Sequence, residues 1–166
     1  MKKLNIISII LSLFLAVSLT ACDEGGDPDP GQTSTVDMAG DWFVEFLVDG
    51  EDIYGIGHAR ITTYNTAADD GTEMWIDDNQ NTWWFKVKTP IDVNSLTFAG
   101  AGLASNVDGY EVTVDILNGV IVKGGATTSG GNISDSIYFE AVFSDDPTTT
   151  YQLVGYKRTG FLEDEH

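Results

Sequence analysis

Two histidines are the candidates for acid–base chemistry near neutral pH. His58 lies in a glycine-containing segment, and His166 stands at the end of the sequence, where we expect it to be mobile. A Ser–His–Asp arrangement would therefore depend on His58. The motifs Gly-x-Ser-x-Gly and His-Glu-x-x-His do not occur in the sequence. A lone histidine of this kind is more often structural or exposed than catalytic, so we expect no established catalytic set, with His58 as the sole candidate.

One acidic segment could be taken for a metal loop. Residues 77–81 read Asp-Asp-Asn-Gln-Asn, and calcium takes several oxygen ligands. Thr82 stands where the EF-hand pattern needs glycine, and Lys88 where it needs a bidentate glutamate. The sequence also lacks a cysteine–histidine cluster for zinc or iron. We therefore expect no metal site and no cofactor.

The first 22 residues have the pattern of a lipoprotein signal. Met1-Lys2-Lys3 supplies a basic start, residues 4–19 are mainly apolar, and Leu19-Thr20-Ala21-Cys22 ends the segment. This order is typical of a signal peptide rather than of a lasting membrane span. The ending resembles a bacterial lipoprotein box, in which the cysteine is acylated and becomes the new N-terminus. Cys22 is the single cysteine of the chain, so we expect lipidation there and removal of residues 1–21.

Residues 22–36 are expected to form a disordered acidic tether, because residues 23–31 combine glycine, proline and acids without an apolar residue. Acyl chains on Cys22 would hold the protein to a membrane. Acids just after the cysteine resemble the surface-export signal of Bacteroidota lipoproteins, whereas in enterobacteria Asp23 would suggest inner-membrane retention. We expect an outer-membrane lipoprotein of the cell envelope, facing either the periplasm or the cell surface.

The charge of the chain excludes one class of partner. The sequence has 26 acids, 8 lysines and arginines and a formal charge of −18. Loss of Lys2 and Lys3 would leave 6 of these bases and a charge of −20. Such a chain repels phosphate backbones and anionic lipid surfaces, so nucleic acid is not an expected partner.

Alternating apolar and polar residues predict a single all-β domain over residues 37–166. The clearest run places Tyr110, Val112, Val114 and Ile116 on one face. Strands with turn signals between them recur every 10–15 residues, which favours an antiparallel up-and-down meander that closes into a barrel of about eight strands. The expected strands are residues 42–49, 53–64, 73–77, 82–88, 96–99, 110–117, 120–123, 133–144 and 150–159.

Three local features carry specific expectations. Asn118-Gly119 is typical of a type I′ hairpin turn. Pro90 cannot donate to a ladder, so we place it between strands. Residues 160–166 are expected to form an acidic tail.

The aromatic residues are the best candidates for contact with a ligand. Trp42 and Phe139 fit an ordinary core, whereas Trp75, Trp83, Trp84, Phe85 and Tyr110 could line a cup. Trp83 and Trp84 are expected to point to opposite faces of one strand. Trp42 near the start and Arg158 near the end could close the barrel through a cation–π contact worth about 0.5–2 kcal/mol.

Several segments together resemble a known family. Gly40-Asp41-Trp42 with Arg158 looks like the Gly-x-Trp and closing arginine of lipocalins and calycins. A longer match over about residues 36–165 resembles the Bacteroidota lipoproteins called lipid-binding putative hydrolases. The segments that carry it are residues 37–42, 62–70, 73–78, 135–139 and 155–165. This resemblance implies a lipocalin-like barrel that binds a lipid or a small apolar molecule, and it supplies no catalytic set.

Three functions stay open at this point. The first is a membrane-anchored barrel that binds a lipid or a small apolar molecule, which the resemblance favours. The second is an ester or lipid hydrolase acting in the same cup through His58. The third is a cell-surface interaction module with a filled barrel and exposed tryptophans.

Overall fold

Eight antiparallel strands follow one another along the chain and close into a barrel, as predicted. The structure is a computed structural model that describes residues 31–166, and its barrel unit is Thr33–His166. The predicted signal peptide, Cys22 and residues 22–30 of the tether lie outside the described residues. The strands are β1 (Gly40–Val48), β2 (His58–Asn65), β3 (Glu73–Asp77), β4 (Lys86–Asp92), β5 (Thr97–Ala104), β6 (Thr113–Thr127), β7 (Ile133–Phe143) and β8 (Asp146–Lys157).

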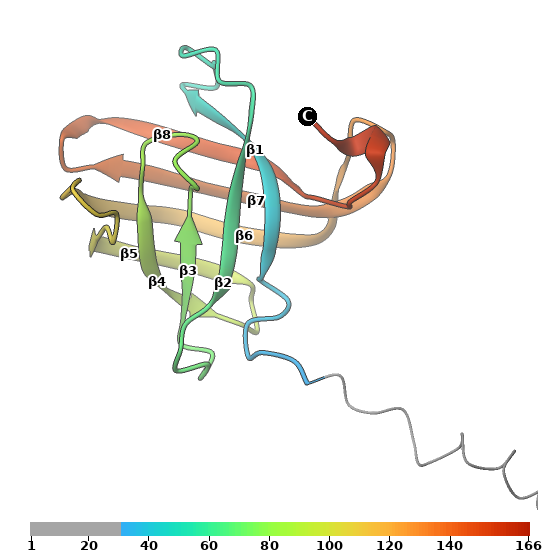
Figure 1. The fold of residues 1–166 in the computed structure, drawn as a ribbon, viewed down its shortest axis with the longest axis horizontal. Coiled ribbons are helices and arrows are strands. Elements are labelled where there is room, and N and C mark those ends of the chain that lie inside the picture. The colour runs from blue at the N-terminus through green and yellow to red at the C-terminus, as the bar shows by residue number, and fades with distance from the viewer. Residues whose placement is uncertain (1–30) are drawn as a thin grey trace, which may run out of the picture. The chain divides into compact units, whose positions relative to one another are not determined.

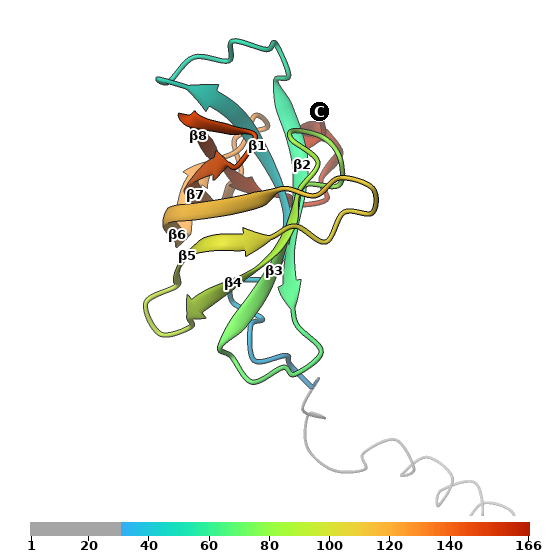
Figure 2. The ribbon, with the colours of Figure 1, turned by 90° about the vertical axis from the view of Figure 1, so that its left-hand side faces the viewer.

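Each strand pairs with the next, and β1 pairs with β8 to close the sheet. The two halves of the barrel lie across one another, so that β2–β4 cross the direction of β6–β8 (Figures 1 and 2). A 3₁₀ turn, η1 (Leu162–Asp164), follows β8. No helix among the described residues is long and apolar enough to cross a membrane.

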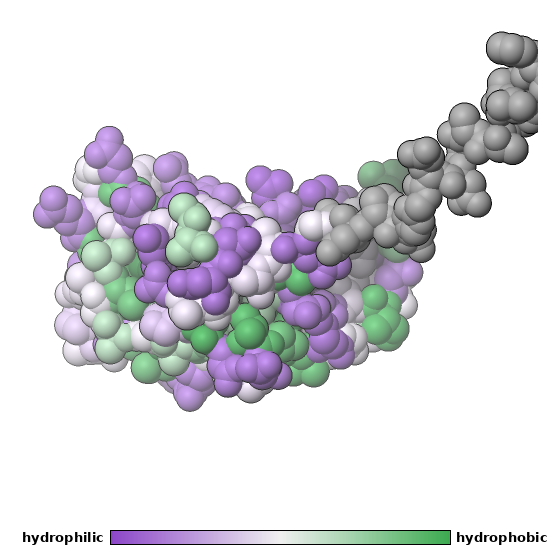
Figure 3. Space-filling model, turned by 90° about the horizontal axis from the view of Figure 1, so that it is seen from below, coloured by the Kyte–Doolittle hydropathy of each residue, from purple (hydrophilic) through white to green (hydrophobic). Residues whose placement is uncertain are grey.

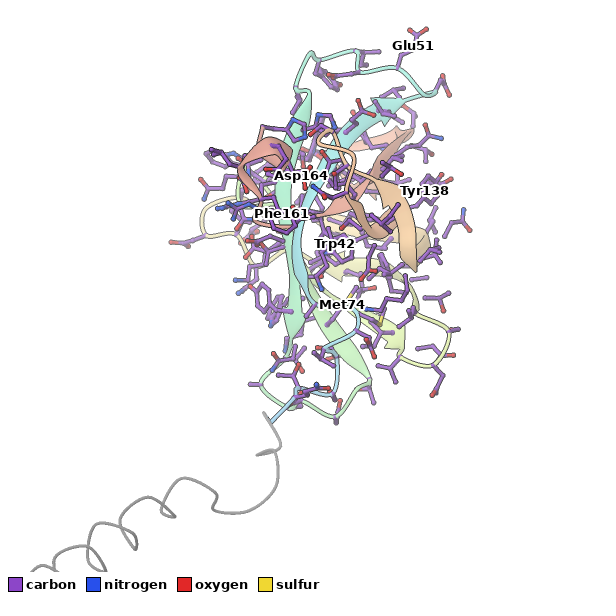
Figure 4. All side chains as sticks on the ribbon, turned by 90° about the vertical axis from the view of Figure 1, so that its right-hand side faces the viewer. Trp42, Glu51, Met74, Tyr138, Phe161 and Asp164 are labelled. Carbon is purple, nitrogen blue, oxygen red and sulfur yellow. The ribbon has the colours of Figure 1, made fainter. Side chains whose placement is uncertain are left out.

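Side chains fill the interior of the barrel. Alternate residues point inward along every strand, and bulky ones meet in a continuous core. Figure 4 shows Trp42 and Met74 within it. The largest fully buried side chains are Trp42, Tyr151, Phe46, Phe85, Phe139, Phe143, Met38, Ile61, Met74, Ile76, Ile116 and Ile121. On the outside, small apolar patches alternate with hydrophilic side chains, as in the view of Figure 3.

The predicted turn at Asn118-Gly119 is wrong, because β6 runs straight through it. Three steps along β6, from Leu117 to Val120, match two steps along β7, which defines a β-bulge. Asn118 has the positive φ that the dipeptide favours, at 53°. A Cβ on Gly119 would lie 2.3 Å from the ring of Phe98. The dipeptide therefore makes a bulge that lets Phe98 pack closely, and it does not reverse the chain.

Two predictions around β4 are also wrong. Pro90 lies inside β4, opposite Glu73. The next residue, Ile91, donates to Thr72, and the β4–β5 ladder begins only at Ile91, so these ladders do not need the missing N–H of Pro90. The strand predicted over residues 82–88 begins only at Lys86. Trp83 and Trp84 therefore lie in the loop before β4 rather than on one strand, and Trp84 has a φ of 57°.

Lys157, rather than Arg158, supplies the cation at the closing seam. Trp42 lies directly opposite Lys157, whose Nζ is 5.8 Å from the ring centroid of Trp42. Successive side chains of a strand point to opposite faces, so only one member of the Lys157-Arg158 pair can share the face of Trp42. Arg158 instead lies 2.7 Å from Glu165. Lys157 crosses Gly40, where a Cβ would lie 2.5 Å from Cε of Lys157.

The acidic tail is fixed to the barrel through Asp164, which is completely buried. Its carboxylate accepts hydrogen bonds from Thr128, Asn132 and Thr159 and from the N–H of Gly130. Figure 1 shows the C-terminal turn beside the β6–β7 loop, and Figure 4 labels Asp164 there. Burial alone would raise the pKa of Asp164, but these bonds outweigh it and lower the pKa from 3.8 to about 2.

Candidate functional site: an aromatic mouth at one end of the barrel

One end of the barrel is built from the loops that follow the odd-numbered strands. In an up-and-down meander these four loops must lie at the same end. They comprise residues 49–57, 78–85, 105–112 and 144–145. Tyr54, Trp83 and Tyr110 come from three of them. We call this end the aromatic mouth and define it by Tyr54, Trp83, Trp84, Tyr110 and Tyr151.

Trp83 covers the interior at this mouth. Its ring stacks on Phe143 at a centroid distance of 5.1 Å and lies 4.9 Å from Tyr151. Tyr151 in turn stacks on Phe46 at a centroid distance of 4.7 Å. Trp83 is partly buried and Tyr54 above it is 52% exposed. A partly exposed ring thus lies directly over fully buried ones, so its displacement would open the aromatic interior to a ligand.

Asp145 of the β7–β8 turn and Asp146, the first residue of β8, hold the polar ends of these rings. Asp145 accepts hydrogen bonds from Nε1 of Trp83, at 3.2 Å, and from the hydroxyl of Tyr110. Asp146 accepts one from the hydroxyl of Tyr151 at 2.7 Å. The bond from Tyr110 holds the pKa of Asp145 below its usual value. Burial, together with Asp145, raises the pKa of Tyr110, so this pair consists of a phenol and a carboxylate at neutral pH.

Asp78 positions the loop that carries both tryptophans. Its buried carboxylate accepts hydrogen bonds from the N–H groups of Gln80, Thr82 and Trp84 and from the hydroxyl of Thr82. The segment that resembled a calcium loop therefore uses this carboxylate to fold its own backbone. Within residues 31–166, no group of three or more acids, histidines or cysteines is placed to hold a metal ion.

A shallow hollow opens beside Trp83. It has a volume of about 250 Å³ and is lined by Thr82, Trp83, Trp84 and Tyr110. Trp84, on the outer side, is 50% exposed. Ligand pockets usually have volumes of about 300–1,000 Å³. The hollow as it stands therefore fits a small apolar group or the end of a longer chain.

The other candidate residues lie elsewhere. Phe85 is fully buried in the core below the mouth. Trp75 is on the outer wall, with the ammonium groups of Lys86 and Lys88 over its ring at 5.3 and 5.1 Å. His58 is exposed on the outer wall beside inward-pointing Ala59, so it does not reach the interior.

Tyr54, Tyr151, Asp145 and Asp146 belong to the mouth, and the sequence analysis did not select them. Asp145-Asp146 was assigned to a turn, and Tyr54 to a strand that in fact begins at His58. The strand order contained the signal that could have found them. In a meander, alternate loops lie at the same end of the barrel, so the loop of Tyr54 and the turn of Asp145 lie at the end that carries Trp83.

The comparison with known families follows the fold. The chain matches the family described as "lipid-binding putative hydrolase" over residues 27–162. The chain therefore belongs to this family. No curated protein matches it.

Proposed function

We propose that the barrel binds a lipid chain or a small apolar molecule at the aromatic mouth, by displacement of Trp83. The observation that carries this proposal is the position of Trp83, partly exposed and stacked over the buried rings of Phe143 and Tyr151. Membership of a lipid-binding family supports the ligand class. Each buried methylene contributes about 0.8 kcal/mol, so a few methylenes would offset the loss of the Trp83 contacts.

The alternative functions have less support from the site. A hydrolase acting in the cup through His58 would need that side chain at the mouth, whereas it lies on the outer wall. A surface interaction module would use the filled interior and exposed Trp84 as they are. The test of ligand binding at the mouth also separates that function from the surface interaction module, because only ligand entry requires Trp83 to move.

Trp83→Ala is expected to tighten binding of a medium-chain fatty acid by about tenfold or more, because the ligand no longer has to displace the Trp83 ring from Phe143 and Tyr151. Tenfold corresponds to about 1.4 kcal/mol. A brominated fatty acid would report binding by quenching tryptophan fluorescence, and calorimetry would report the affinity of the variant.

Trp75→Ala is the matched control, because it removes a partly exposed tryptophan from the outer wall. Its affinity should equal that of the wild type. Equal affinities in all three proteins would contradict binding at the mouth. Failure of the wild type to bind would favour the interaction module.

The proposal includes a lipid anchor on Cys22 and a place in the outer membrane. Its support is the signal pattern of residues 1–22. Intact-mass measurement of the full chain purified from its host is expected to show a protein that begins at Cys22 and carries acyl groups. A chain retaining residues 1–21, or a free thiol at Cys22, would contradict the anchor. Fractionation of the cell envelope then tests whether the protein is located in the outer membrane.

A further inference from the structure

Both arginines and both histidines of the chain line one hollow on the outer wall. The hollow has a volume of about 440 Å³. Its remaining lining residues are Phe43, Ile56, Ala59, Asn81 and Glu165. The chain has 26 acids against 8 lysines and arginines, so a hollow that gathers both arginines and both histidines differs sharply in charge from an otherwise acidic chain. We call it the arginine–histidine hollow.

Arg60 brings a positive charge that no carboxylate in residues 31–166 neutralises by an ion pair. Its backbone is fixed, because its carbonyl accepts a hydrogen bond from Asn81 at 2.6 Å. Arg158 is partly neutralised by Glu165, at 2.7 Å, and by Asp41, at 3.9 Å. One free guanidinium and one shared guanidinium therefore line the hollow.

The two histidines lie face to face. Their ring centroids are 3.9 Å apart with an interplanar angle of 7°, so His166 stacks on His58. The edge of His166 lies against Phe43 at 5.0 Å, and the hydroxyl of Tyr156 is hydrogen-bonded to its Nε2. Burial, and then the neighbouring His58, lower the pKa of His166.

We infer that the arginine–histidine hollow binds a phosphate group. Arginine forks match phosphate oxygens in a bidentate manner, and imidazolium groups donate further hydrogen bonds. The phosphate could belong to a lipid headgroup or to a free phosphate ion. The apolar side chains of Phe43 and Ile56 in the lining would contact a group attached to the phosphate. None of the five residues that define the mouth lines this hollow, and the inference does not depend on the function proposed there.

The charges around the hollow set the expected pH dependence. A bound dianion favours the protonated form of His166, whose pKa is held below 6.5, so binding should tighten as the pH falls below that value. Nearby carboxylates reduce the positive charge of the hollow, but none forms an ion pair with Arg60 in residues 31–166. The titratable and charged groups that face the pair from β1, β2, β8 and the tail are Asp41, Glu45, Arg60, Tyr156, Arg158, Asp164 and Glu165.

Arg60→Gln should weaken phosphate binding by about tenfold or more, because it removes charge-assisted hydrogen bonds to the phosphate. The imidazole NMR signals of His58 and His166 are followed during titration with inorganic phosphate at constant ionic strength. Lys88→Gln is the matched control, because it removes one exposed positive charge outside the hollow. Lys88→Gln should bind as the wild type does.

A parallel titration with a short-chain phosphatidic acid distinguishes the two sources of phosphate. Affinity at least about tenfold above that of inorganic phosphate identifies a lipid headgroup, and equal affinity identifies a free phosphate. Both results require the loss in Arg60→Gln. Histidine signals that respond to neither probe would overturn the inference, as would equal binding by Arg60→Gln and wild type.

Discussion

Gly155→Ala is expected to destabilise the barrel by about 3 kcal/mol, near the upper end of the usual range for overpacking. Gly155 lies in β8 between Val44 of β1 and Ile137 of β7, so both sides of its backbone are paired. A Cβ there would lie 1.9 Å from the carbonyl oxygen of Phe43 and 2.7 Å from Cα of Val44. These neighbours are backbone atoms, so relief requires the closing seam itself to separate. Urea unfolding followed by circular dichroism measures the loss.

Val154→Ala is the control for this prediction. It changes the preceding residue of β8, whose side chain is 37% exposed. Its free energy of unfolding should stay within about 0.5–1 kcal/mol of the wild type. If Gly155→Ala proves equally mild, the close approach of β1 and β8 at this point is refuted.

Asp164→Asn should release the C-terminal segment and alter the acid sensitivity of the fold. Four donors converge on the carboxylate, and a neutral amide cannot accept them all equally well. A Cβ on Gly130 would lie 2.4 Å from Oδ1 of Asp164, which shows how closely the β6–β7 loop encloses the carboxylate of Asp164. Hydrogen exchange at residues 128–132 should therefore rise in the variant.

The pH dependence follows from the direction of the shift. The pKa of Asp164 falls from 3.8 to about 2 on folding, so the unfolded chain binds this proton more readily. The stabilisation by the carboxylate is present above about pH 4 and is lost as the pH falls towards 2. The difference in unfolding free energy between wild type and Asp164→Asn should shrink over that interval. A difference that is constant from pH 5 to pH 2 would contradict the role of the charge.

The sequence predicts the barrel because side-chain alternation is a local property. Residues 73–77 form β3 as predicted, and Ile137, Phe139, Ala141 and Phe143 are buried as expected. Asn118-Gly119 and Pro90 were misassigned because a positive φ or a missing N–H is compatible with both a turn and an irregular strand. The neighbouring strand decides between them. In β6, the neighbour is Phe98, whose ring occupies the space that a side chain at Gly119 would need.

The sequence analysis named part of the mouth. Trp83, Trp84 and Tyr110 were chosen as ligand candidates because aromatic side chains supply a large apolar contact area. Their arrangement depends on Asp78 and Asp145, which accept hydrogen bonds from residues 6 and 62 positions away in the sequence. In a chain with 26 acids, nothing local distinguishes these two from solvated ones. The buried Asp164 was missed on the same ground.

Closure of β1 on β8 also constrains the order in which the protein can form. Trp42 and Lys157, which lie opposite each other, are separated by 115 positions, whereas every other ladder joins consecutive strands. Joining such distant segments costs about 2 kcal/mol more loop entropy than closing a hairpin of about ten residues. A chain emerging N-terminus first must therefore keep β1 unpaired on one edge until β8 arrives. During that interval the edge is open to other chains, so a newly made molecule is most prone to aggregation just before its last strand docks.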